Sequence, residues 1–193
     1  MPSSRRTEKR MKSAKIAGNG FSHGMLPAER QAIKRLGHLP VNFRAMAAVS
    51  NLFRAARGVG RHIEASVLGP DQLSWTSFIS MWVLWVCGSM EVRELAATVG
   101  MSRPTASCVL VTLKRRKCVQ TRTGAKDGRT VVVSLTPKGR RTVKRLYPAF
   151  NAQEAAVTSS LGPREQETLA RMLRAIIHTV EKVDPSLEVT LRV

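Results

Sequence analysis

Apolar residues recur every three or four positions over residues 41–69, a spacing typical of one face of an α-helix. The positions in this stripe are Val41, Ala45, Val49, Leu52, Ala56, Val59 and Ile63. Gly69 and Pro70 follow the stripe, and we expect them to end the helix. A second helix, from Ser74 to about Val86, is apolar on nearly every side and carries the aromatic residues Trp75, Phe78, Trp82 and Trp85. A helix of this kind must be buried between other elements.

Residues 95–113 predict two helices joined by a tight turn. Ala96 is small enough for two helices to cross closely, and Gly100 can adopt the positive φ that such a turn needs. Ser102 has the side chain of a helix N-cap, and Pro104 suits the first turn because its missing N–H is not needed there. The second helix separates its two faces, and its apolar face contains Ala106, Val109, Leu110 and Leu113.

The other face of this second helix carries short hydroxyl side chains, one cation and a valine. Such side chains can reach base edges in a DNA major groove about 12 Å wide. An isolated amphipathic helix with a solvated face would look the same, but the segments that follow favour DNA. The candidate DNA-contacting residues are Ser102, Arg103, Pro104, Thr105, Ser107, Cys108, Val111 and Thr112.

After four cations at 114–117 the pattern changes to an alternation with period two. Residues 119–122 predict one β-strand, and the β-branched run 130–135 predicts its partner. The connection contains Asp127 and Gly128, a pair that favours a tight turn in a hairpin long enough to project from the body.

Lys126 and Arg129 make this hairpin cationic. A basic hairpin beside a recognition helix can touch phosphates or enter the minor groove, where narrow A·T tracts attract arginine. Arg129 is the candidate for the minor groove. Asp127 either completes the turn or orients Arg129.

Thr136 and Pro137 begin a further helix that Pro148 is expected to kink. Its first turns are crowded with cations and lack acids, namely Lys138, Arg140, Arg141, Lys144 and Arg145. Cations at a helix N-terminus oppose the helix dipole, so either phosphate compensates for them or they are solvated. A break at residues 162–163 precedes a last helix with a wide apolar stripe formed by Leu169, Met172, Leu173, Ile176, Ile177 and Val180.

A stripe this wide requires a partner, and the expected dimerisation residues are Leu169, Leu173, Ile176, Ile177 and Val180. Together with the first helix and the far half of the preceding one, the last helix would form a two-fold interface. Such an interface would place two recognition helices about 34 Å apart, one turn of DNA.

Four segments of the sequence resemble the MarR family of winged helix-turn-helix transcription regulators, namely GMSRPTAS, KRRKCVQTR, DGRTVVVSLTPKGR and LGPREQETLARML. The resemblance implies a mainly α-helical fold with a small β-hairpin wing, in which a winged helix-turn-helix unit joins a helical dimerisation region. It also implies a homodimer that binds a pseudo-palindromic operator in double-stranded DNA and releases it when a small ligand or an oxidant binds. Cys108 stands where many members carry arginine, and Lys117 replaces a frequent helix-ending glycine.

In this family, effectors lodge between the dimerisation helices and the winged domain. The resemblance therefore implies a ligand pocket lined by Arg57, Arg61, His62, Trp75 and Trp82. Aromatic walls with nearby cations would suit a small aromatic or lipophilic anion. The alternative is that the tryptophans are ordinary core residues.

Composition agrees with a nucleic-acid-binding protein. The chain has 193 residues, 43% of them hydrophobic, and a net charge of +19 from 32 Lys and Arg against 13 Asp and Glu. Self-repulsion of this size favours a polyanionic partner, and nucleic acid is expected rather than a membrane because the apolar run 78–88 is too short to span a bilayer. Residues 1–20 lack the apolar core of a signal peptide, so we expect a cytoplasmic protein.

The three cysteines, Cys87, Cys108 and Cys118, form no Cys-x-x-Cys pair and fit a reducing compartment. Each lies in or beside an apolar stretch, so we expect them to be buried and inert. Oxidation of Cys108 would add polarity where DNA docks, which keeps a redox-sensing regulator as an alternative. The histidines are scattered, so we expect no metal, no cofactor and no catalytic centre.

The expected organisation is a basic arm (1–40), a first dimerisation helix (41–69), the winged helix-turn-helix unit (70–135), C-terminal dimerisation helices (136–183) and a tail (184–193). The arm, with nine Lys or Arg against two Glu, is either a solubilising tail or a flexible phosphate binder. The sequence thus predicts a homodimeric, ligand-responsive repressor. The alternatives are an architectural DNA-binding protein, which the absence of apolar wedges in the hairpin disfavours, and a nucleic-acid-modifying enzyme, which lacks a catalytic constellation.

Overall fold

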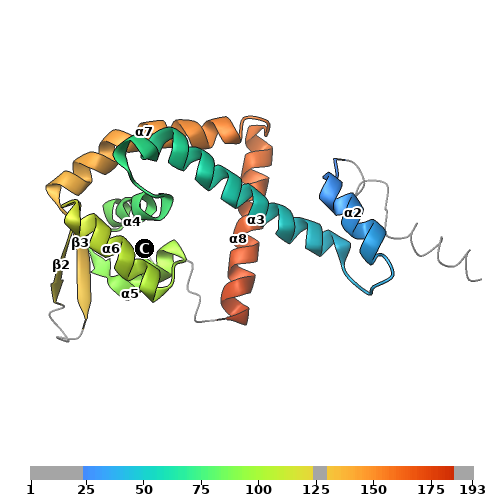
Figure 1. Cartoon of the computed structure of the whole chain (residues 1–193), viewed down its shortest axis with the longest axis horizontal. Coiled ribbons are helices and arrows are strands. Elements are labelled where there is room, and N and C mark those ends of the chain that lie inside the picture. The colour runs from blue at the N-terminus through green and yellow to red at the C-terminus, as the bar shows by residue number, and fades with distance from the viewer. Residues whose placement is uncertain (1–23, 124–129, 185–193) are drawn as a thin grey trace, which may run out of the picture. The chain divides into compact units, whose positions relative to one another are not determined.

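The computed structural model describes residues 24–123 and 130–184 (Figure 1). These residues divide into two compact units, with the boundary after Gly58, inside helix α3 (Phe43–Ile63). Each unit is described by itself below. Both are mainly helical, and the only strands within the described ranges belong to the second unit.

The N-terminal unit contains a helix that the sequence pattern did not predict, α2 (Pro27–Leu36), within the segment expected to be a basic arm. Glu29 fixes its start, because its Oε2 accepts a hydrogen bond from the Leu26 N–H at 2.6 Å. The other carboxylate oxygen of Glu29 accepts from Asn51 Nδ2 at 2.9 Å, which ties α2 to α3. This helix was missed because polar capping defines it more than an apolar stripe does.

Helix α3, within which the boundary between the two units lies, ends earlier than predicted. The sequence predicted one helix over 41–69, but regular α-helix stops at Ile63, and a wider π-helical turn, η1 (Glu64–Leu68), and a short 3₁₀ turn, η2 (Gly69–Asp71), follow. Val67 and Leu68 of η1 are both buried in the core. The carboxylate of Glu64 accepts from the N–H of Trp75 at 2.8 Å, so η1 also caps the next helix.

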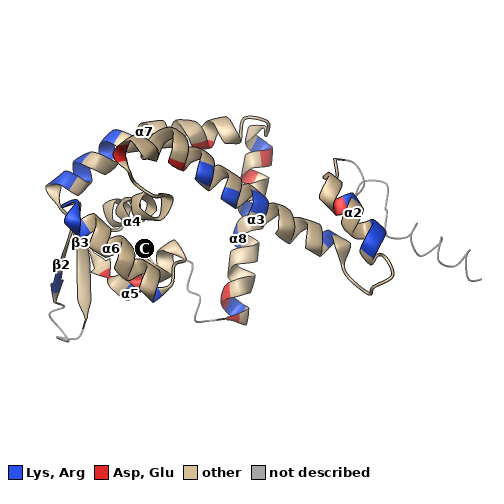
Figure 2. Cartoon of the chain, viewed as in Figure 1, with Lys and Arg blue, Asp and Glu red and all other residues tan. Residues whose placement is uncertain are grey.

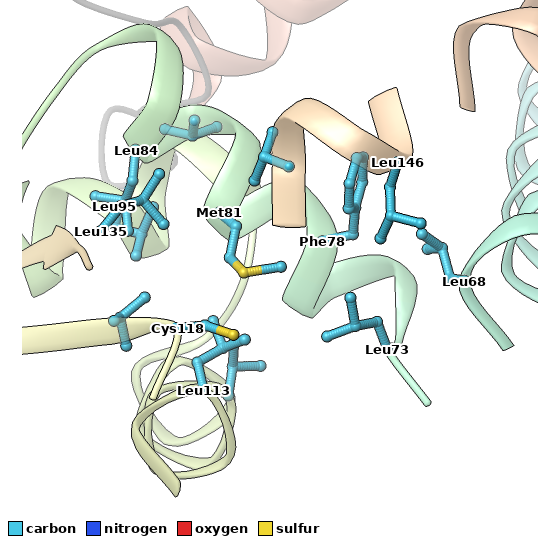
Figure 3. Packing of buried hydrophobic residues seen from close by; sticks show 14 of the residues in the cluster. Leu68, Leu73, Phe78, Met81, Leu84, Leu95, Leu113, Cys118, Leu135 and Leu146 are labelled. Atoms are coloured by element: carbon cyan, nitrogen blue, oxygen red, sulfur yellow. The ribbon is translucent and has the colours of Figure 1, made fainter. Parts of the chain in front are cut away.

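The helix α4 (Trp75–Val86) lies at the centre of the second unit. Ser74, where the sequence predicted the helix to begin, is its N-cap, with its Oγ accepting from the Ser77 N–H at 3.2 Å. Figure 3 shows Phe78, Met81 and Leu84 of α4 among apolar side chains of the surrounding elements. Full burial of a side chain of this size stabilises the fold by about 1.5 to 3 kcal/mol. The prediction of a buried helix is correct except at the C-terminal end, where Trp85 and Val86 are exposed.

Two helices and a small antiparallel sheet follow α4. Their order is β1 (Met90–Glu91), α5 (Val92–Val99), α6 (Arg103–Arg115), β2 (Val119–Thr123) and β3 (Val131–Leu135). β3 lies in the middle of the sheet, with Thr121 and Met90 of its two neighbours both paired with Val133. The hairpin was predicted, although β3 begins at Val131 rather than at Thr130. Strand β1 was not predicted, because two residues are too few to show an alternation.

The unit ends with two long helices, α7 (Pro137–Val157) and α8 (Pro163–Val183). Thr136 caps α7 as predicted, its Oγ1 accepting from the Gly139 N–H at 3.1 Å, and the helix continues through Pro148. Val143, Leu146 and Phe150 attach α7 to the core. In contrast, no residue of α8 is buried in the chain. Among the described residues, no helix has both the length and the apolar character needed to cross a bilayer.

Candidate nucleic-acid interface

The turn between α5 and α6 is built as the sequence predicted. Gly100 ends α5 with a φ of +70°, a left-handed conformation that glycine adopts without strain. The N–H of Met101 bonds to the Ala96 carbonyl at 2.9 Å, and that of Gly100 bonds to the Ala97 carbonyl at 3.0 Å. Ala96 itself is buried. These bonds complete the end of α5 and redirect the chain into α6.

Two hydroxyls fix the start of α6. Ser102 Oγ accepts from the Thr105 N–H at 3.3 Å, and the hydroxyls of Ser102 and Thr105 lie 2.8 Å apart. Pro104 occupies the first turn, as expected. The predicted apolar face is confirmed, because Ala106, Val109, Leu110 and Leu113 are all buried. The position of α6 against the core is therefore fixed along its whole length.

The opposite face of α6 is exposed and carries Arg103, Ser107, Cys108 and Val111. Val111 is 68% exposed. The Ser107 hydroxyl donates to the Arg103 carbonyl at 3.1 Å, which leaves its oxygen free to accept. Thr112 differs from the others because it is half-buried; like Ser107, its hydroxyl donates to the carbonyl four residues earlier, Cys108 O, at 3.1 Å.

The cysteines do not share one environment. Cys118 is buried, Cys87 is half-buried and Cys108 is exposed. The expectation that all three are buried is therefore wrong for Cys108. Its apolar neighbours in sequence lie on the other side of α6, because one residue along a helix rotates the side chain by about 100°.

Strands β2 and β3 form the base of the predicted wing, with Thr123 paired with Val131 at the last rung. Lys126, Asp127 and Arg129 lie outside the described residues. At the base of the wing, a hollow of about 410 Å³ is lined by Glu91, Val92, Arg93, Ala96, Arg103, Ser107, Thr130 and Val131. Arg93 Nε lies 2.6 Å from Glu91 Oε2. The structure thus brings two predicted contact residues of α6, Arg103 and Ser107, to the side of the wing.

The residues expected to line a ligand pocket are only partly brought together. Trp75 and Trp82 are half-buried on α4, where their rings face rings of α7: Trp75 and Phe150 have centroids 5.3 Å apart, and Trp82 and Tyr147 6.3 Å apart. His62 Nε2 lies 2.8 Å from Gln153 Oε1, which also links it to α7. Arg61 is exposed on the last turn of α3. Arg57 is exposed and belongs to the N-terminal unit.

The sequence pattern did not reveal a cluster that holds the end of α6. Arg145 of α7 makes two bonds to the Asp71 carboxylate, Nη2 to Oδ1 at 2.6 Å and Nη1 to Oδ2 at 3.2 Å. These hydrogen bonds, and then the charge of Asp71, raise the pKa of Arg145. Arg116, the C-cap of α6, donates to the main-chain oxygens of Asp71 and of Gln72, the latter at 2.6 Å.

Arg145 was expected to meet phosphate or to be solvated, and its pairing with Asp71 corrects that expectation. No sequence signal indicated the pair, since 74 positions separate the two residues. Across residues 24–123 and 130–184, no three His, Cys, Asp or Glu side chains group in a way that could hold a metal ion.

A capped helix-turn-helix, an exposed second helix and an antiparallel hairpin define a winged helix-turn-helix DNA-binding protein. No family model matches the sequence. A relative from Bacillus subtilis strain 168, an uncharacterized HTH-type transcriptional regulator named YwaE, is 33% identical over 157 residues, which cover 78% of this chain and 92% of YwaE. The chain belongs to the MarR family of winged helix-turn-helix transcription regulators. Its relatives are regulators of a non-enzymatic family, so the chain is a transcription regulator and not an enzyme.

Solved structures agree on the fold. The regulator MosR of M. tuberculosis, solved in complex with DNA, is 31% identical and has a TM-score of 0.56. The match covers 67% of this chain and 95% of the MosR chain. A MarR mutant from E. coli complexed with operator DNA has a TM-score of 0.63 at 18% identity, over 69% of this chain and 96% of its own. The predicted fold class, helical with a small winged sheet, is confirmed.

Proposed function

We propose that two copies of this chain bind a pseudo-palindromic operator, with one α6 in the major groove of each half-site. The observation that carries this proposal is the exposed face of α6, which presents a cation, a hydroxyl and an aliphatic side chain and contains no acidic residue. The opposite face of α6 is buried in the core. The likeness to MosR, solved with DNA, supports it. We expect the protein to act on chromosomal DNA in the cytoplasm.

Each exposed residue of α6 has a role that its chemistry suits. Arg103 can donate two bonds to O6 and N7 of guanine, and the Ser107 oxygen can accept from a base amino group. Val111 and Cys108 offer apolar contact to a thymine methyl group. Ser102, Pro104 and Thr105 shape the first turn, whereas half-buried Thr112 lies at the edge of the contact. Arg129 would enter the minor groove, with Lys126 on phosphate and Asp127 in the turn; these three lie outside the described residues.

We place the dimer contact on α8. Leu169, Ile176 and Val180 are each 40 to 41% exposed in the single chain, and Leu173 and Ile177 lie half-buried beside them. A second α8 related by two-fold symmetry would cover this stripe. Dimerisation would set the spacing of the two α6 helices on the operator.

Regulation as a repressor by a small aromatic or lipophilic anion would act through α4 and α7. Trp75 and Trp82 are half-buried, His62 is exposed beside α7, and Arg61 supplies a cation on the same unit. Calorimetric titration with aromatic carboxylates, in the presence and absence of operator, tests this effector site. If the operator affinity is the same with and without a bound compound, the proposed regulation by an effector is wrong.

The DNA-reading role of α6 is tested by selecting binding sites from random duplexes with the wild type and with Ser107→Ala. We expect the variant to change base preference inside the half-site by about 1 to 3 kcal/mol, because one base contact is altered. Ser66→Ala is the matched control, since Ser66 is exposed and its hydroxyl also donates to the carbonyl four residues earlier, His62 O at 2.8 Å. Equal loss on every sequence would show that Ser107 does not read bases.

A further inference from the structure

Between Glu94 and Glu154 the sequence contains thirteen Lys or Arg residues and a single acid, Asp127. Many of these cations gather where α6 ends and α7 begins (Figure 2). We call six of the exposed ones the basic ridge: Lys114, Arg115, Lys117, Arg140, Arg141 and Lys144. Of these six residues, only Lys114 and Arg115 belong to α6, the helix that carries the base-reading residues.

The two halves of the ridge form one surface because α7 starts directly against the turn after α6. The Thr136 hydroxyl donates to the Lys117 carbonyl at 2.7 Å, and the Thr136 N–H donates to the Cys118 carbonyl at 3.0 Å. Lys138 Nζ donates to the Arg116 carbonyl at 2.9 Å. Gly139 allows this approach, since a Cβ there would lie 2.0 Å from the Cys118 oxygen.

The charges of the ridge are not neutralised within the described part of the chain. None of its six members forms an ion pair there, whereas neighbouring Arg145 is paired with Asp71. Lys114 has a hydrogen bond, but to the neutral Thr121 hydroxyl at 3.1 Å.

The positions on α7 are unfavourable in the absence of an anion. Lys144 follows Arg140 by four residues and Arg141 by three, so it faces a like charge at both positions on one side of the helix. They also lie near its positive N-terminal end. A mutually repelling set of cations on a fixed surface is suited to a polyanion.

The position of the ridge identifies the polyanion. Helix α6 has 13 residues and is therefore about 20 Å long, longer than the roughly 12 Å width of the major groove. With the N-terminal turns of α6 at the bases, Lys114 and Arg115 leave the groove at the level of the phosphates. The cations of α7 continue this surface beyond α6. We propose that the basic ridge binds the sugar–phosphate backbone of the same duplex outside the base-reading contacts, an inference that rests on the proposed binding of α6 to DNA.

The test compares two triple variants that remove the same charge. One carries Arg140→Ala, Arg141→Ala and Lys144→Ala; the control carries Arg164→Ala, Arg171→Ala and Arg174→Ala, on exposed positions of α8. Helical periodicity places the control positions opposite the apolar stripe of α8. Affinities for the selected operator and for a random duplex of equal length are measured over a range of salt concentrations.

We expect the ridge variant to lower the slope of log K against log salt by about 0.9 for each phosphate that the protein no longer neutralises, up to about 2.7. The decrease should be the same on both duplexes, so the ratio of operator to random affinity stays constant. Exchanging Arg for Lys and Lys for Arg at the three ridge positions should restore the slope, because binding to phosphate requires charge.

Three results would overturn the proposal: equal slopes for the ridge and control variants, a loss confined to the operator, or failure of the charge-preserving variant to restore the slope. The outcome is separable from that of the proposed function. If the wild type selects no operator, the proposed base reading by α6 is wrong. The salt dependence of binding to random DNA would still test the ridge in that case. If Ser107→Ala changes base preference while the ridge variant keeps the control slope, only the ridge fails.

Discussion

Lys117 adopts a positive φ at the end of a helix, where the fold uses a glycine at the equivalent position of another helix. Helices α5 and α6 end in the same motif: Met101 and Cys118 each bond to the carbonyl five residues earlier, at 2.9 Å. In the first motif Gly100 provides the positive φ, and in the second Lys117 adopts a φ of +59°. A left-handed residue with a Cβ costs about 1 to 2 kcal/mol. The departure noted in the sequence is therefore real backbone strain.

Lys117→Gly should raise the free energy of unfolding by up to about 1 kcal/mol. Relief of the strain exceeds the roughly 0.5 to 1 kcal/mol that glycine adds through the entropy of the unfolded chain. Chemical denaturation at high salt measures the change while screening the removed charge. Lys117→Ala is the control, because it removes the charge but keeps the Cβ. A glycine variant no more stable than the alanine variant would contradict the strain.

At the scale of elements, two arginines connect the η2 turn to the rest of the second unit. Arg116 donates to main-chain oxygens of Asp71 and Gln72, and Arg145 binds the Asp71 side chain. The turn between α3 and α4 is thus held by the end of α6 and by α7. These contacts differ in strength, because the Arg145 side chain is 59% exposed.

Asp71→Asn should cost no more than about 1 kcal/mol of stability, and less at high salt, as expected for an exposed ion pair. Arg116→Met should cost about 1 to 3 kcal/mol, because carbonyls of the turn lose their donors. Because the pKa of Arg145 is raised, the stabilisation that depends on its charge is complete below the strongly basic range in which a free arginine titrates, and it is lost only above that range. The difference between wild type and Asp71→Asn that arises from Arg145 should therefore be constant between about pH 6 and 9. Thermal and chemical unfolding at two salt concentrations measure both variants, and a larger cost for Asp71→Asn would reverse this ranking.

The elements that the sequence predicted are those with local signals. Gly100, Ser102 and Thr136 each mark a helix end through the conformation or bonding of one residue, and the structure confirms all three. Contacts between distant segments left no such signal. Strand β1 exists through its pairing with β3, and Asp71 meets Arg145 only after folding. For Cys108, a run of apolar neighbours was misleading where helical phase would have been correct.

At the scale of the whole molecule, the apolar stripe of α8 is the feature that the single chain leaves uncovered. Ile176→Asp should weaken dimerisation by several kcal/mol, because it would bury an unpaired charge in the proposed interface. Operator affinity should fall with it, since the two half-sites would no longer be bound by one assembly. Light scattering at several protein concentrations measures the oligomeric state.

The neighbouring Ala175→Asp introduces the same charge on another face of α8 and should leave the dimer intact, because Ala175 is exposed and outside the stripe. Circular dichroism checks that both variants remain folded. A dimer that survives Ile176→Asp would place the two-fold contact elsewhere in the chain.

The aromatic contacts between α4 and α7 give the protein a built-in optical probe. All three tryptophans of the chain, Trp75, Trp82 and Trp85, lie on α4, and each has a ring partner on α7. Intrinsic fluorescence therefore reports on this one helix pair, whereas far-ultraviolet circular dichroism averages over every helix. If the two units melt separately, the emission signal should follow only the unit that contains α4, and the two spectroscopic transitions would not coincide.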